Sequence, residues 1–200
     1  MHIKNIVEQF KDVTIQAVVD NQIENANLSV YNIPFLTKNV DEVLADPSIK
    51  AVIIAASSSA HVELITKAAC AKKHIFCEKP IAFNTQEIAK AMAAVEENGV
   101  KLQVGLNRRF DKNFQKVKEE IASGMIGKVH LIKITNRDPV RPDIHFIPRS
   151  GGLFLDFNVH DFDMARFITG EEVISVYAAG ANLIDPRIGG VMIMGDRGTG

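Results

Sequence analysis

The chain has 200 residues and a formal net charge of −1, with 46% hydrophobic and 24% charged residues. This composition is ordinary for a globular protein in water, and the near-zero charge argues against nucleic acid or an anionic membrane as a partner. With no secretory pattern and no apolar run near the roughly 20 residues that span a bilayer, we expect a cytoplasmic protein, and small neutral ligands remain possible.

Short β-branched runs alternate with helical patterns in the first half of the chain. The N-terminal segment HIKNIVEQF predicts a helix, and further helices are expected over 41–46, 59–72 and 85–98. The expected strands are 13–20, 51–56, 74–79 and 101–105. Such alternation is typical of parallel βαβ units, and the wholly apolar strand at 51–56 should be covered on both faces.

The pattern changes after Gly105. We expect a helix at about 111–123, a strand at 128–135, a proline-rich loop at 138–148, a helix around 150–167 and a strand at 172–179. The predicted fold class is therefore α/β. An incomplete Rossmann-type parallel sheet over 1–105 is followed by part of an α+β domain over 106–200.

The glycines are distributed unevenly, because all 13 lie at or after Gly99. A dinucleotide site normally needs a glycine-rich turn after its first strand, so that backbone amides can approach the pyrophosphate. We interpret that strand and turn as missing, since the chain opens in the helix that would follow them. Gly195, Gly198 and Gly200 are unlike a phosphate loop, because no helix follows them. We therefore expect a piece of a longer protein, incomplete at both ends.

Two smaller features concern the cofactor and metals. Asp20 ends the strand at 13–20, the position where a carboxylate bonds the adenosine ribose 2′-hydroxyl, although an aspartate there is often only a turn former. Cys70 and Cys77 have no metal-ligand spacing. We expect buried free thiols and no metal site.

The segment GGLFLDFNVHDFDMARF, residues 151–167, combines large apolar side chains with acids and a histidine. Asp156, His160 and Asp163 are spaced i, i+4 and i+7, which places them on one face of a helix. A helix that is apolar around most of its circumference should be largely buried. A carboxylate beside a partly buried histidine raises its proton affinity and suits a general base, whereas acids near a helix N-terminus can also be purely structural. Both interpretations stay open on this segment alone.

Two polar segments follow expected strands, where open α/β sheets bind ligands: Ser57-Ser58-Ser59-Ala60-His61 and Glu78-Lys79-Pro80. The sequence EKP after a strand, followed by GG-x-x-x-D-x-x-x-H, resembles the Gfo/Idh/MocA family of nicotinamide-dependent sugar and polyol dehydrogenases. The resemblance runs from about His2 to Ile188. Within that family, residues 105–114, 126–139 and 150–173 are most similar to the inositol-oxidising members.

The resemblance implies a site as well as a reaction. It implies NAD as cofactor, oxidation of myo-inositol to its 2-keto form, and a homo-oligomer, a tetramer at full length. The implied catalytic residues are Lys79, Asp156 and His160, with His160 as the base, Asp156 orienting it and Lys79 stabilising charge on the substrate oxygen.

The remaining implied site residues bind the two ligands. Those implied to contact substrate hydroxyls are Asn107, Arg108 and Asp163, and those implied to line the cofactor are Asp20, Ser57, Ser58, His61, Glu78 and Lys79. For Arg108, a helix-capping or interdomain salt bridge is an equal alternative. Two functional alternatives also stand: a dehydrogenase for another cyclitol or sugar, and a catalytically silent fragment that only binds a ligand or partner.

Overall fold

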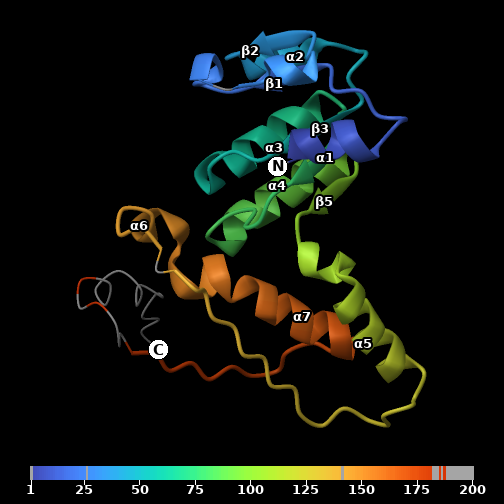
Figure 1. Ribbon diagram of the computed structural model, residues 1–200, viewed down its shortest axis with the longest axis vertical. Helices are drawn as coiled ribbons and strands as arrows, with labels where there is room; N and C mark the ends of the chain where they lie inside the picture. Colours follow the sequence, from blue (N-terminus) through green and yellow to red (C-terminus); the bar gives the residue numbers. More distant parts are fainter. Residues whose placement is uncertain (1, 26, 141, 182–184, 186, 188–200) are drawn as a thin grey trace. The chain divides into compact units, whose positions relative to one another are not determined.

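The computed structural model describes residues 2–25, 27–140, 142–181, 185 and 187 (Figure 1). The chain divides into two compact units. Unit 1 comprises Met1–Ala55, Val62–Cys77 and Ala89–Gln103, and unit 2 comprises Ala56–His61, Glu78–Ile88 and Val104–Gly200. The glycines 195, 198 and 200 lie outside the described residues. Within the described chain, no helix is both long enough and apolar enough to cross a bilayer.

Unit 1 is built on parallel strands. Strands β1 (Ala17–Val19) and β2 (Phe35–Thr37) form one parallel pair, with Ala17 opposite Phe35. Strands β3 (Ala51–Ile54), β4 (His74–Cys77) and β5 (Leu102–Val104) form a second sheet in that order, with Ile54 opposite Cys77. The parallel pairing confirms the α/β class expected from the alternation of strands and helices.

Helices alternate with these strands along the chain. They are α1 (His2–Gln9), α2 (Val40–Ala45), α3 (His61–Cys70) and α4 (Thr85–Asn98), with short 3₁₀ turns at Ile23–Asn25 (η1), Ser29–Tyr31 (η2) and Ser58–Ala60 (η3). Helix α3 is amphipathic, and its buried residues Ile65, Ala68 and Ala69 follow the i, i+3, i+4 spacing of a core-facing stripe. These elements confirm the predicted order, although the strand expected over 13–20 is shortened to three residues.

Three expectations about strands were wrong, and one strand was missed. Strand β2 was not expected, because it is only three residues long. The segments 128–135 and 172–179 have no regular secondary structure, and within the described residues neither pairs with a strand. Strand β3 is not covered on both faces, since the side chain of Ile53 is 45% exposed while Ile54 is buried. An apolar or alternating pattern forms a regular strand only where a partner completes the hydrogen-bond ladder.

Unit 2 contains the helical part of the chain. Its elements are the 3₁₀ turn η4 (Asn107–Phe110), helices α5 (Lys112–Ala122), α6 (Ile147–Ser150) and α7 (Val159–Thr169), and the π-helical turn η5 (Leu153–Phe157). Helix α5 begins at Asp111, whose carboxylate accepts from the backbone N–H groups of Asn113 and Phe114. Helices α5 and α7 lie side by side (Figure 1).

The segment 151–167 differs from the continuous buried helix that its pattern predicts. Asp156 lies in η5 and His160 in α7, so a widened turn separates them. The buried side of α7 carries Asp161 and Asp163 with Met164, whereas Phe162 is 49% exposed. The acids are buried because arginines pair with them, whereas Phe162 on the other face stacks on Phe154 of the preceding turn and stays half-exposed.

Candidate active site

Lys79 and Asp156 are in direct contact, although 77 residues separate them in the sequence. The Nζ of Lys79 donates to the backbone carbonyl of Asp156 at 2.7 Å and to its Oδ1 at 3.1 Å. Both side chains are partly buried, so water screens this ion pair less than it screens a surface pair. Of the three N–H donors of the ammonium, two therefore serve Asp156, and one remains for another oxygen.

His160 is the second residue of α7 and is half-buried. Burial and the nearby Lys79 and Arg108 cations lower the pKa of His160 below its ordinary value, and Asp161 and Asp163 offset this only in part. The carboxylates that raise the proton affinity of this histidine are Asp161 and Asp163, and burial and the two cations outweigh them. The carboxylate of Asp156 is bound to Lys79 instead. A lowered pKa leaves the imidazole neutral near neutral pH, which is the form that accepts a proton.

Asp161 is a buried carboxylate at the start of α7, and three side chains donate to it. The Nη1 of Arg108 lies 2.6 Å from its Oδ1, the amide of Asn158 lies 3.3 Å from its Oδ2, and the amide of Asn136 lies 3.4 Å from its Oδ1. Arg108 thus makes a salt bridge with Asp161, both in unit 2. Its expected contact with substrate stays a prediction. The Oδ1 of Asn158 is buried and has no partner among the described residues.

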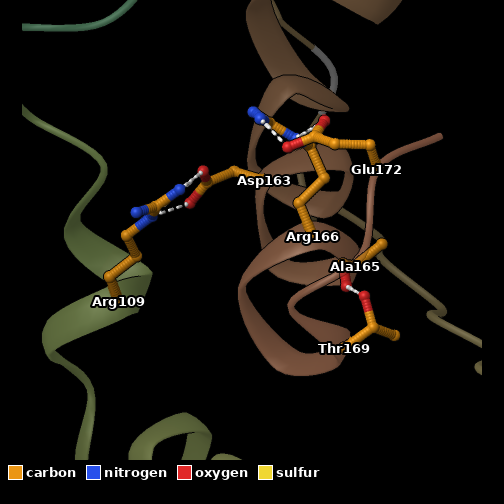
Figure 2. Close-up of polar contacts among 6 residues, drawn as sticks. All are labelled: Arg109, Asp163, Ala165, Arg166, Thr169 and Glu172. Atoms are coloured by element: carbon orange, nitrogen blue, oxygen red, sulfur yellow. Dashed lines mark hydrogen bonds and ion pairs between the residues drawn. The ribbon is translucent and has the colours of Figure 1, made fainter. Parts of the chain in front are cut away.

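Asp163 is held by Arg109 in a bidentate pair (Figure 2). The Nε of Arg109 lies 2.9 Å from Oδ2, and its Nη2 lies 2.6 Å from Oδ1. The Asp163 carboxylate raises the pKa of Arg109 further above its already high value. Because both Asp163 oxygens accept from this guanidinium, the described contacts of Asp163 are structural, and its expected contact with substrate stays a prediction.

Asn107 lies at the start of η4, close behind β5 in the sequence. Its side chain is exposed, and its backbone N–H donates to the carbonyl of Gly105 at 2.9 Å. An exposed amide at the carboxyl end of a parallel strand is suited to bind a hydroxyl group. The structure thus leaves Asn107 accessible for the substrate contact expected of it.

The residues expected to line the cofactor are in different environments. Asp20 accepts from the backbone N–H of Gln22 at 2.7 Å, as a turn former does. Ser57 is exposed and its hydroxyl lies 3.3 Å from that of Ser59, while Ser58 begins η3. Glu78 directly follows β4. The serines and Glu78 follow the carboxyl ends of parallel strands, and their expected contact with a nucleotide cofactor stays a prediction.

His61 does not fit the cofactor contact expected of it. The side chain is 1% exposed. Its Nδ1 lies 2.7 Å from the Pro80 carbonyl, and its Nε2 lies 3.1 Å from the Ala56 carbonyl. With both ring nitrogens on backbone oxygens, this imidazole has no ring nitrogen left for a ligand.

Sequence reasoning missed the residues that support the site. Asn136, Asp161 and Arg109 carry the polar contacts of this part of the molecule, yet none stood out as a motif. The two adjacent arginines and the two aspartates at alternate positions of α7 were the available signal. Within the described chain, no cluster of three or more metal-ligating side chains is present.

Comparison with known proteins gives consistent matches over the chain. Residues 1–106 match the model of the GFO/IDH/MocA oxidoreductase family, NAD-binding Rossmann fold, and residues 114–196 match the GFO/IDH/MocA C-terminal domain. Myo-inositol 2-dehydrogenase of Thermotoga maritima is 47% identical over 152 residues, which are 76% of this chain and 46% of that protein.

Two solved structures resemble the chain in fold. A probable dehydrogenase from Thermotoga maritima superposes with a TM-score of 0.90 at 39% identity, covering 95% of this chain and 57% of that one. The scyllo-inositol dehydrogenase of Lactobacillus casei with bound NAD(H) and scyllo-inositol gives a TM-score of 0.72 at 28% identity, covering 86% and 53%. The chain spans about half the length of the curated relatives it matches.

Proposed function

Because the chain belongs to the Gfo/Idh/MocA oxidoreductase family, we propose that it carries the alcohol-oxidising site of an NAD-dependent inositol 2-dehydrogenase. The reaction would convert myo-inositol to its 2-keto form. The contact of Lys79 with Asp156, beside a half-buried His160 of lowered pKa, is the observation that carries the proposal. The inositol dehydrogenases among the relatives support this choice of substrate.

His160 acts as the general base in this proposal. Oxidation of a secondary alcohol requires loss of the hydroxyl proton as hydride leaves the same carbon. The low pKa of His160 keeps its imidazole neutral and ready to accept that proton. The same cations that lower this pKa, Lys79 and Arg108, would stabilise negative charge on the substrate oxygen.

Lys79 supplies the electrophilic part of the site. Asp156 accepts two of its hydrogen bonds and so fixes the ammonium, which leaves the remaining N–H for the substrate oxygen. In this role Asp156 orients Lys79, rather than orienting His160 as the resemblance implied. We propose Asn107 as a further contact to a ring hydroxyl, since its amide is exposed.

The cofactor would be bound by the first half of the chain, 1–105, and the substrate by 106–200. NAD supplies the hydride acceptor when it is bound. Ser57, Ser58 and Glu78 would hold its nicotinamide side, and Asp20 would accept from the adenosine ribose. The carboxylate of Asp20 forms its turn through Oδ1, so Oδ2 is the oxygen proposed for the ribose.

The test is steady-state NADH formation with myo-inositol, scyllo-inositol and glucose. His160→Gln and Lys79→Met should each lower kcat by about 10²-fold, the usual scale for losing a general acid or base. The Kd for NAD, measured by calorimetry, should change little in His160→Gln. Arg166→Gln is the matched control, because Arg166 lies on α7 like His160 but pairs with exposed Glu172 beyond the end of the helix. Undiminished turnover in His160→Gln would remove it as the base, and NAD binding without NADH formation in the native chain would establish the silent alternative.

A further inference from the structure

His61 is a fully buried, titratable side chain that the proposed reaction does not use. It is 1% exposed, and both of its ring nitrogens lie within hydrogen-bonding distance of backbone carbonyl oxygens. The shorter contact is to Pro80, at 2.7 Å, and the longer is to Ala56, at 3.1 Å. Buried histidines cost free energy unless their polar atoms are satisfied, so this ring is held by specific contacts rather than by packing alone.

The two carbonyls belong to two different loops. Ala56 follows β3 in the sequence, and Pro80 follows β4. Because His61 itself follows the loop after β3, a hydrogen bond from its ring to the Pro80 carbonyl ties this loop to the loop after β4. A ring with one proton can donate to only one of these carbonyls, and Pro80 makes the shorter contact.

Pro80 is directly bonded to Lys79, the residue whose ammonium reaches Asp156. A lysine side chain has many rotamers, and its ammonium is placed only as well as its backbone is placed. We propose that His61 is a positioning residue, which fixes the Pro80 carbonyl and thereby holds Lys79 where its ammonium contacts Asp156. The catalytic role of Lys79 rests on the proposed function, but the positioning itself does not.

His160 reports where the Lys79 ammonium lies. Four charged groups act on this imidazole: Lys79 and Arg108 lower its pKa, and Asp161 and Asp163 raise it. If Lys79 moves away, one lowering influence disappears and the pKa of His160 rises. This readout needs no turnover, so a failure of the positioning proposal and a failure of the proposed function can be told apart.

The experiment is an NMR titration of the His160 ring in the 200-residue chain, with its resonance assigned by comparison with His160→Gln. Lys79→Met should raise the pKa of His160, and this rise should be the largest among the variants. His61→Phe, which keeps an aromatic ring but has no nitrogen, should shift the pKa in the same direction. In the Lys79→Met background, His61→Phe should add nothing. An unchanged pKa in His61→Phe, or a further shift in the double variant, would overturn the proposal.

Two conservative variants separate the contacts and decide the question if His61→Phe does not fold. The amide nitrogen of Asn is placed like Nδ1, so His61→Asn can still donate to Pro80 and should keep a near-native pKa at His160. The amide nitrogen of Gln is placed like Nε2, so His61→Gln can donate only to Ala56 and should give the shifted pKa. The reverse order would overturn the proposal, and so would equal values in the two variants. Amide spectra with native dispersion establish that each variant is folded.

Discussion

Replacing Arg109 by methionine tests the importance of the ion pair that holds α7. The Asp163 side chain is 7% exposed, whereas that of Arg109 is 38% exposed. Removing one partner of a buried pair leaves the other charge desolvated and unpaired, which costs about 3–5 kcal/mol. Because water partly screens Arg109, we expect a value near the low end, about 3 kcal/mol. This includes the loss of the contact of its guanidinium with the Phe167 ring, at 5.4 Å from the ring centroid.

The matched control is Arg166→Met, which removes a second bidentate arginine–carboxylate pair, between Arg166 of α7 and Glu172 beyond its end (Figure 2). The side chains of Arg166 and Glu172 are 48% and 75% exposed, so their pair should contribute about 0–1 kcal/mol. A double variant, Arg109→Met with Asp163→Leu, removes the buried charge as well and should recover most of the lost stability.

The measurement is urea-induced unfolding followed by circular dichroism, with the free energy of unfolding extrapolated to water. Arg109→Met should lower the midpoint strongly, and Arg166→Met should leave it almost unchanged. Equal losses in the two variants would refute the argument from burial. A double variant no more stable than Arg109→Met would show that the unpaired carboxylate is not the cause of the loss.

Three other predictions follow from local geometry. Gly151 has φ +81°, and a Cβ there would lie 2.6 Å from Phe83, whereas Gly124 at φ +77° has open space around it. Gly151→Ala should therefore cost about 2 kcal/mol more than Gly124→Ala in the same unfolding assay, and equal costs would exclude a clash. The lowered pKa of His160 means that the unfolded chain binds the extra proton first, so stability should fall as the pH drops below about 6.5, and His160→Gln should flatten that part of the stability–pH curve. Asp111→Ala removes the cap of α5 and should cost about 1 kcal/mol, and a loss near zero would show that water replaces the cap.

The order of elements in the first half was predictable because each had a strong local signal. Apolar runs such as 51–56 and the amphipathic spacing of α3 follow directly from strand and helix periodicity. Strand β2 gave no such signal, since three residues do not establish a period. At 128–135 and 172–179 a strand was predicted wrongly, although the local signal was present. Their pattern is strand-like, but a strand also needs a partner, which a local pattern does not reveal.

The candidate site was predictable in its membership more than in its contacts. Motif resemblance selected Lys79 and Asp156, and the structure brings these two together. It assigned Asp156 to the histidine, whereas the Asp156 carboxylate contacts the lysine. It assigned His61 to the cofactor, because position at a strand end does not say which way a ring points. Pairings such as Arg108 with Asp161 depend on distant segments meeting, so spacing along one helix does not predict them.

The π-helical turn η5 determines how the spacing between Asp156 and His160 is to be interpreted. The turn closes through a bond from the Asn158 N–H to the Leu153 carbonyl, five residues back, at 2.9 Å. It therefore accommodates one more residue than an α-helical turn would. Deleting a single residue at 154 would let the turn tighten into ordinary α-helix and rotate its neighbours by about 100° relative to α7. Two related chains that differ by a one-residue gap in this turn would therefore orient the carboxylate of the aspartate differently, even when both keep the aspartate and the histidine.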